Sequence, residues 1–160
     1  MKPAAGGGGK GLHVAHNFQE LRDVLPSARR EAKLAFGDET LLVEKYLLHA
    51  RHIEFQVVAD NFGSSTHLGE RECSLQRRHQ QVVEEAPAPR FSEINREIMG
   101  AAALALTSAI GYQNLGTIEF LVDADSPQTF YFMEMNTRLQ VEHRVTEMIT
   151  GLDLVECQLR

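Results

Sequence analysis

Two glutamates lie in segments whose other residues are almost all apolar. Glu119 falls within residues 116–121, and Glu134 falls within residues 130–136. Burying a carboxylate without a partner is costly, so each glutamate needs a cation or several hydrogen-bond donors. A hairpin that turns through residues 123–128 would bring the two carboxylates together on one face, where a divalent cation would relieve their repulsion. These residues therefore predict a metal site.

Asn136 adds a third oxygen donor at the spacing of the same strand face. Glu119, Glu134 and Asn136 offer oxygen ligands only, which favours Mg²⁺ or Mn²⁺ with phosphate oxygens completing the coordination. The alternative is a buried salt-bridge network in which the two glutamates pair with arginine or lysine. The sequence favours the metal site, and the salt-bridge network remains the alternative interpretation.

Polar residues continue beyond Asn136 in steps of two, at Arg138, Gln140 and Glu142. If the chain stays extended, these side chains share one face. The planar guanidinium of Arg138 suits a small oxyanion such as carboxylate, carbonate or phosphate, and Glu142 beside it can take a proton. The alternative is an exposed edge strand with scattered charges.

Consecutive glycines lie near the start of the chain, between Lys2 and Lys10. Their backbone amides can approach phosphate oxygens because no Cβ stands in the way. The segment matches neither a Walker loop, since Gly11 follows Lys10, nor the dinucleotide-binding fingerprint. A flexible linker is the alternative. The loop residues are Gly6, Gly7, Gly8 and Gly9.

Composition limits the class of protein that these residues can belong to. The chain has 160 residues, of which 43% are hydrophobic and 24% charged, as in an ordinary soluble globular domain. Its net charge of −6 argues against a nucleic-acid partner, which needs a basic face. No apolar run reaches membrane-spanning length, and the start lacks the apolar stretch of a signal peptide. We therefore expect a cytoplasmic protein that does not bind a membrane. Cys73 and Cys157 are expected to be free thiols rather than zinc ligands.

The pattern of the first half predicts one helix and several strands. Asn17 and Glu20 form a capping box that opens a helix, and Pro26 is expected to divide that helix before it resumes over residues 27–36. Strands are expected over residues 41–46, 52–60 and 64–68, the last two as a hairpin. Residues 70–89 are polar and then punctuated by prolines, and are expected to be an extended crossing between two sub-structures.

The second half predicts a long helix, a hairpin and a helical end. Ser92 is a good cap for a helix over residues 93–110 that stops at Gly111. Strands are expected over residues 117–122 and 129–135, joined by a turn. Residues 145–160 are expected to be helical, with a break at Gly151 and a new cap at Asp153.

Several motifs together carry a resemblance to a known family. They are KPAAGGGGKG at residues 2–11, EKY at 44–46, RHIEFQ at 51–56, ERECSLQRRHQQVVEEAPAP at 70–89, GTIEFL at 116–121 and EMNTRLQVEHRVTEMITG at 134–151. In this order they resemble the ATP-grasp core of biotin carboxylases, including those of acetyl-, propionyl- and methylcrotonyl-CoA carboxylases and of pyruvate carboxylase. The resemblance implies an α+β fold with antiparallel sheets and helices, in which the nucleotide lies between a lid subdomain and a central sheet.

The resemblance also implies subdomains and residue roles. Residues 1–69 would form the lid subdomain with the glycine loop and adenine pocket, and residues 70–160 part of the central and C-terminal subdomain. Glu119, Glu134 and Asn136 would surround the metals. The implied ATP contacts, besides the four loop glycines, are Lys2, Glu44, Lys45, Leu47, His52, Gln76, His79 and Leu121. The implied bicarbonate site comprises Arg138, Gln140, Val141 and Glu142, with Glu142 as the base.

The implied reaction activates bicarbonate with MgATP as carboxyphosphate, whose carbon dioxide is captured by biotin on a carrier domain. A carboxyltransferase subunit or domain and a homo-oligomeric parent enzyme are further implied partners. Two positions depart from the family: Gln81 stands where a lysine usually helps to bind bicarbonate, and Arg144 stands where a proline is usual. We expect weaker bicarbonate binding from the loss of a charged donor at Gln81.

The resemblance covers the chain but implies a larger enzyme. Members of the family have a preceding domain and a following segment that also reach the active site, so the isolated chain is expected to be incomplete and inactive. The alternative function is a non-catalytic fragment that binds ATP and magnesium or packs against a partner.

Overall fold

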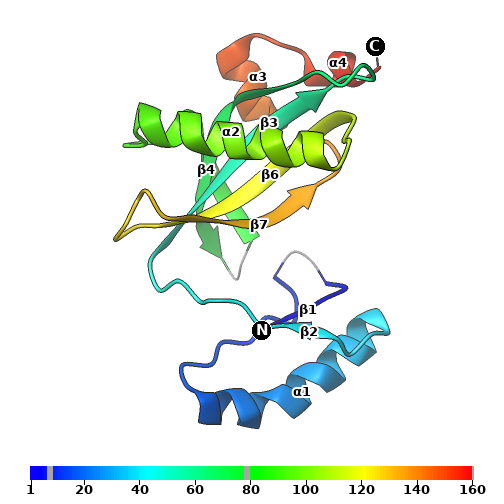
Figure 1. Ribbon diagram of the computed structural model, residues 1–160, viewed down its shortest axis with the longest axis vertical. Coiled ribbons are helices and arrows are strands. Elements are labelled where there is room, and N and C mark those ends of the chain that lie inside the picture. The colour runs from blue at the N-terminus through cyan, green and yellow to red at the C-terminus, as the bar shows by residue number, and fades with distance from the viewer. Residues whose placement is uncertain (7–8, 78–79, 160) are drawn as a thin grey trace. The chain divides into compact units, whose positions relative to one another are not determined.

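The computed structural model describes residues 1–6, 9–77 and 80–159 (Figure 1). The chain forms two compact units, one of Met1–Leu48 with Arg77–Gln80 and one of His49–Gln76 with Gln81–Arg160. We expected the boundary between residues 69 and 70, whereas the units divide at Leu48. The reason is that the strand after Leu48 pairs along its whole length with a strand of the second half.

The first unit combines a long helix with a short two-stranded sheet. Strand β1 (Lys2–Pro3) pairs antiparallel with β2 (Leu41–Leu42). The strand expected over residues 41–46 is therefore only two residues long, and its partner is the start of the segment that was expected to be a loop. Helix α1 (Phe18–Phe36) starts at Asn17, whose side chain accepts a hydrogen bond from the Glu20 amide, as the capping box predicts.

Helix α1 does not break at Pro26, so that prediction is wrong. A proline inside a helix removes one hydrogen bond and costs about 3 kcal/mol. Beyond Pro26 the helix buries Ala28 and Ala32, which lie on the same side of the helix. This packing stabilises the helix enough to offset the lost hydrogen bond. Gly37, in the left-handed conformation, ends the helix as expected.

The second unit is built on a five-stranded sheet with the order β5-β4-β3-β6-β7. Its strands are β3 (Ala50–Ala59), β4 (Ser65–Arg77), β5 (Gln80–Glu85), β6 (Asn114–Asp123) and β7 (Phe130–Asn136). Both predicted hairpins are present. The predicted crossing over residues 70–89 is wrong, because most of it forms the paired strands β4 and β5. Its charged residues Arg71 and Glu70 find ion-pair partners on β3 and on the helix over residues 93–109, which their polarity alone did not suggest.

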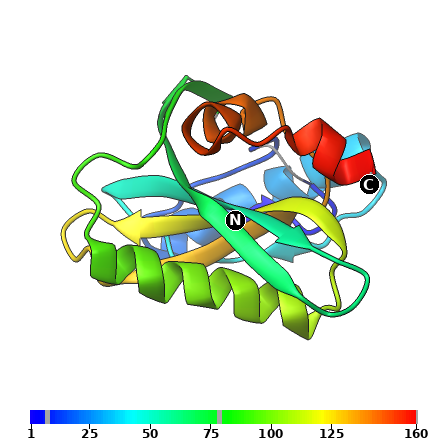
Figure 2. The same ribbon diagram turned by 90° about the horizontal axis from the view of Figure 1, so that it is seen from above.

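Alternation along the strands gives this sheet one apolar face and one polar face. Ile53 and Phe55 lie opposite Phe120 and Ile118 on the apolar face, which packs against helix α2 (Glu93–Ala109). Seen from above, α2 runs along one side of the sheet and helix α3 (His143–Thr150) lies on the other (Figure 2). The polar face is therefore the one that faces α3.

The predicted caps of the second half are confirmed. Ser92 accepts a hydrogen bond from the Asn95 amide at the start of α2, Gly151 ends α3 in the left-handed conformation, and Asp153 accepts from the Glu156 amide at the start of helix α4 (Leu154–Leu159). Among the described residues, the helices are all too short or too polar to cross a membrane.

Candidate functional site

A row of charged residues crosses the polar face of the sheet. Arg71 on β4 lies opposite Glu54 on β3, Glu54 lies opposite Glu119 on β6, and Glu119 lies opposite Glu134 on β7. The predicted pairing of Glu119 with Glu134 is therefore confirmed. Glu54 and Arg71 are site residues that the sequence did not predict. The alternation of His52, Glu54 and Gln56 with apolar residues on β3 was the signal that marks Glu54 as part of this face.

Glu119 is almost fully buried, with 4% of its surface exposed, and is surrounded by nitrogen atoms. Its Oε2 lies 2.8 Å from His52 Nε2, while Oε1 accepts a close hydrogen bond from Asn136 Nδ2 and a longer one, 3.3 Å, from Gln140 Nε2. The contact with His52 is an ion pair without hydrogen-bond alignment. Burial lowers the pKa of His52, but Glu119 together with the charges of Glu54 and Glu134 raises it by more, so the net pKa lies above its ordinary value.

Glu54 is fully buried and is paired with Arg71. The Nε atom of Arg71 donates to Glu54 Oε1 at 2.6 Å, and neither side chain is exposed to solvent. Burial raises the pKa of Glu54, and the charge of Arg71 opposes that rise without cancelling it. Gln81, at the position where the resemblance expects lysine, donates to the other oxygen of Glu54 at 3.4 Å.

This arrangement fits a divalent cation. Glu54, Glu119 and Glu134 place three carboxylates in one row, with the Arg71 guanidinium against Glu54 and the His52 ring against Glu119. Ligand atoms of His52, Glu54 and Glu119 all lie within 4.8 Å of one another. The predicted ligand set of Glu119, Glu134 and Asn136 shares Glu119 with this group, and its oxygen atoms suit Mg²⁺. The oxygen donors of the predicted set therefore suit Mg²⁺, and two carboxylates of the row already have Arg71 and His52 beside them.

The chain beyond Asn136 does not stay extended, so the expected common strand face of residues 138–142 is not formed. Strand β7 ends at Asn136 and the chain turns into α3, for which Glu142 is the residue before the first turn. Gln140 and Glu142 are buried, Arg138 is exposed, and Val141 has 83% of its surface exposed. The turn directs Gln140 onto Glu119, and the buried Oε1 of Gln140 has no hydrogen-bond partner among the described atoms.

Three of the implied ATP contacts gather at one end of β3. Gln76 Nε2 lies 2.8 Å from His52 Nδ1, and Leu121 lies opposite His52 in the strand register. In the other unit Lys2 Nζ lies 3.0 Å from Glu44 Oε2. Lys45 and Leu47 follow β2 in a segment without helix or strand.

Glycines of the predicted phosphate loop are described in part. A Cβ on Gly6 would lie 3.1 Å from the Phe36 ring, and Gly9 adopts a φ of 77°. Gly6 is therefore packed closely and Gly9 has a backbone conformation that favours glycine. Gly7, Gly8 and His79 lie outside the described residues.

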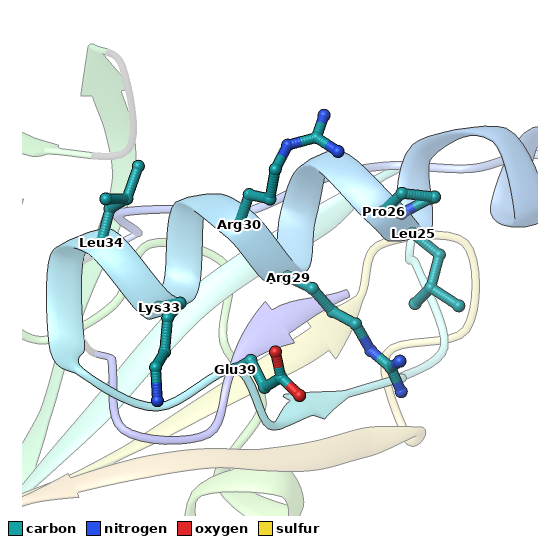
Figure 3. Close-up of a pocket in the computed structure, with 7 residues that line it drawn as sticks. All are labelled: Leu25, Pro26, Arg29, Arg30, Lys33, Leu34 and Glu39. Atoms are coloured by element: carbon teal, nitrogen blue, oxygen red, sulfur yellow. The ribbon is translucent and has the colours of Figure 1, made fainter.

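A separate hollow of about 520 Å³ lies along α1 in the first unit (Figure 3). The side chains of Arg29 and Lys33 extend on either side of Glu39 there, while Leu34 points away from it. Among the described residues, those that line it include none of the predicted site residues. The hollow is thus a surface feature of the helix, distinct from the polar face of the sheet.

The sheets, the helices and the carboxylate row define an ATP-grasp fold, and solved structures of that fold match closely. The biotin carboxylase of Campylobacter jejuni, a complex with a β,γ-ATP compound, is 51% identical with a TM-score of 0.94, covering 99% of this chain and 35% of that one. The biotin carboxylase domain of 2-oxoglutarate carboxylase from Hydrogenobacter thermophilus, a complex with MgADP, ADP and bicarbonate, is 48% identical with a TM-score of 0.93, and covers 99% of this chain and 35% of that one.

The sequence matches the family described as "Carbamoyl-phosphate synthase L chain, ATP binding domain" over residues 1–160, and the chain belongs to that family. Within it, the resemblance to biotin carboxylases is confirmed. The methylcrotonoyl-CoA carboxylase subunit alpha of Dictyostelium discoideum is 56% identical, and the propionyl-CoA carboxylase alpha chain of Ruegeria pomeroyi is 54% identical, each over the whole chain. The chain spans 23% of the length of each of these relatives.

Proposed function

We propose that the chain supplies the MgATP and bicarbonate site of an enzyme that carboxylates biotin on a carrier protein, with carboxyphosphate as the intermediate. The row of three carboxylates beside the amides of Asn136 and Gln140 is the observation that carries this proposal. The likeness to biotin carboxylases supports it, since one solved relative holds MgADP and bicarbonate.

In this proposal Glu119, Glu134 and Asn136 hold the magnesium ions, which neutralise charge on the phosphate oxygens of ATP. Lys2 and the glycine loop contact those phosphates. His52 and Gln76, which already contact each other, hold the ribose.

The adenine pocket is proposed to be formed by Glu44, Lys45, Leu47 and Leu121. The lid would comprise residues 1–69 and the remainder of the site residues 70–160, as the resemblance implies.

The bicarbonate end of the proposed site is the turn that leads into α3. Arg138 would pair with the anion, with Gln140 and Val141 beside it, and Glu142 would remove the proton of bicarbonate. The bicarbonate oxygen then attacks the γ-phosphorus of ATP, and ADP leaves. The unpaired Oε1 of Gln140 is an acceptor that a protonated substrate could satisfy.

The parent protein is proposed to work with a biotin carboxyl carrier domain and a carboxyltransferase, as a homo-oligomer. The names of two relatives, a subunit alpha and an alpha chain of acyl-CoA carboxylases, support further subunits, and the solved domain dimer of the Hydrogenobacter thermophilus relative supports the homo-oligomer. We place it in the cytoplasm, although relatives named mitochondrial and chloroplastic have closely similar sequences.

Calorimetric titration of the chain with ATP, with and without Mg²⁺, tests the proposal. Glu119→Gln and Glu134→Gln should each weaken MgATP binding by about tenfold or more, because each removes a charged ligand. Asp125→Asn is the matched control, since Asp125 lies in the exposed β6–β7 turn and should leave affinity unchanged. Equal affinity in all four proteins would show that the carboxylate row does not bind the metal.

The alternative is a fragment that binds ATP and magnesium or packs against a partner without catalysis. This alternative is supported by the length of the match, because the chain spans only 23% of the Dictyostelium discoideum relative. Bicarbonate-dependent ATP hydrolysis that free biotin stimulates separates the two. We expect none from the isolated chain, and clear turnover would overturn the expectation that it is incomplete.

A further inference from the structure

We infer that Arg71 is a positioning residue that sets the place of Glu142 by fastening helix α3 to the sheet. This inference rests on the proposed function, because Glu142 is there the base that acts on bicarbonate. It concerns a residue to which neither the sequence motifs nor the proposed ligand sets assign a role.

The contacts of Arg71 reach three other elements. It is fully buried on β4, and besides Glu54 its Nη1 donates to Gln56 Oε1 on β3 at 2.9 Å and to Thr146 Oγ1 on α3 at 2.8 Å. Its Nη2 lies 3.4 Å from Thr117 Oγ1 on β6. A guanidinium has a rigid, planar set of donors, so these bonds fix the distance from the sheet to α3 as well as neutralising Glu54.

Thr146 connects this cluster to Glu142. The two residues are four positions apart, one turn along the chain, and Thr146 is only 1% exposed. The carbonyl of Glu142 accepts a hydrogen bond from the Val145 amide at 3.0 Å, which ties Glu142 to the first turn of α3. A shift of α3 therefore moves Glu142 with it.

On the other side of Glu142, Gln140 donates to Glu119. The turn that carries Glu142 is thus fastened to the sheet at both ends, at Glu119 by Gln140 and at Arg71 by Thr146. The first attachment includes Glu119, a proposed metal ligand, so nucleotide binding is expected to act on it. The second contains none of Glu119, Glu134 and Asn136, although Arg71 also pairs with Glu54 of the carboxylate row, and it serves as the reference for the proposed base.

Substitution of Arg71 itself would leave Glu54 buried without its partner and could unfold the protein. Thr146 offers a milder test, because Thr146→Val removes one hydroxyl at nearly constant volume and leaves the Glu54 pair intact. Thr146→Ser keeps the hydroxyl and should therefore keep the bicarbonate affinity of the unchanged chain. Thr150→Val is the matched control on the same helix, because the Thr150 hydroxyl donates to the Thr146 carbonyl and not to the sheet.

Affinities for MgATP and for ¹³C-labelled bicarbonate, measured in the 160-residue chain, provide the readout. Thr146→Val should weaken bicarbonate binding by about tenfold, the effect of one lost hydrogen bond to a charged group, and leave MgATP affinity within about twofold. Thr146→Ser and Thr150→Val should match the unchanged chain. A purely structural role would instead change both affinities together, or neither, and would overturn the inference.

Amide hydrogen exchange separates failure of this inference from failure of the proposed function. Thr146→Val should increase exchange in the first turn of α3 and not in α2, whether or not any ligand binds. If the unchanged chain binds no bicarbonate, the proposed function fails. Amide hydrogen exchange in α3 then still tests whether Thr146 and Arg71 attach this helix to the sheet. Exchange in α3 equal to that of Thr150→Val would refute the attachment.

Discussion

At the scale of single residues, the balance of charge around Glu54 depends on which side chain stands at position 81. Glu54 is buried, Arg71 bonds one of its oxygens, and Gln81 reaches the other with a neutral amide. A lysine there would bring a second positive charge to Glu54, beside that of Arg71. A bicarbonate ion bound next to the carboxylate row would then be held more strongly.

Gln81→Lys should therefore raise the affinity for bicarbonate by about tenfold, the difference between a charged and a neutral hydrogen bond. Titration of labelled bicarbonate in the presence of MgADP measures it. Gln80→Lys adds the same charge at an exposed neighbouring position and should have little effect. If both variants gained equally, general charge attraction would explain the result and the specific role of position 81 would be excluded.

Some site residues were predictable from sequence and others were not, for a physical reason. Glu119 and Glu134 were predictable because a carboxylate within an apolar strand requires a partner, and two such strands with one turn between them align. Arg71 was not, because its segment is polar throughout and its partners Glu54 and Thr146 lie 17 and 75 residues away along the chain. The pairing of β3 with β4 brings Glu54 to Arg71, and the packing of α3 on the sheet brings Thr146 to it.

At the scale of elements, α2 is held to the sheet by a buried ion pair as well as by apolar packing. Arg96 on α2 donates to both oxygens of Glu70 on β4, each at 2.8 Å, and the Glu70 side chain is only 1% exposed. Burial raises the pKa of Glu70, but the hydrogen bonds of Arg96 and the Ala88 amide lower it by more, so its net pKa lies below the ordinary value.

Arg96→Met should lower the free energy of unfolding by about 3 kcal/mol at neutral pH, because Glu70 is left charged and buried. The pair stabilises the fold above the ordinary pKa of glutamate, and this contribution is lost as pH falls through the lower pKa of folded Glu70. In the variant, burial raises that pKa, so acid protonates Glu70 and relieves the penalty. The difference between the two proteins should therefore begin to shrink above about pH 4.5, at the raised pKa of Glu70 in the variant, and should be lost once the pH is below the lowered pKa of Glu70 in the unchanged protein.

Urea unfolding over a series of pH values measures this difference. Glu93→Gln is the control, because Glu93 is the other ion-pair partner of Arg96 and its side chain is 71% exposed. This substitution should change the free energy of unfolding by less than about 0.5 kcal/mol. A difference that stayed constant with pH would mean that Arg96 acts through packing and not through the charge of Glu70.

Element ends were more predictable than element interiors. Asn17, Ser92, Gly37 and Gly151 mark helix ends because local chemistry decides them. Pro26 and residues 70–89 were misinterpreted because tertiary packing outweighs local preference there. Ala28 and Ala32 are buried, and the buried Arg71 and Glu70 find ion-pair partners on β3 and α2.

At the scale of the whole molecule, the fold class followed from the motifs, whereas the division of the chain did not. The two hairpins were visible in sequence as separate pairs of strands. Their union in one sheet depends on the pairing of β3 with β6 across some sixty residues, which carries no local signal. This pairing assigns everything after Leu48 but a short piece at Arg77–Gln80 to the second unit.

Residues 43–48 connect the two units and carry three of the residues proposed to bind adenine. The segment has no regular secondary structure, and Tyr46 and Leu48 are 57% and 74% exposed. Backbone of this kind is open to proteases. Chymotrypsin should therefore cleave the free chain after Tyr46 or Leu48.

MgATP should slow this cleavage by about tenfold, because a bound adenine would order the segment and proteolysis follows the population of the open form. Phe62 provides an internal control: it is 93% exposed in the turn between β3 and β4, and cleavage there should be independent of nucleotide. Mass spectrometry of timed digests follows both sites in one sample. If MgATP protected Phe62 as much as Tyr46, inhibition of the protease would explain the result. If it protected neither, residues 43–48 would not form the adenine pocket.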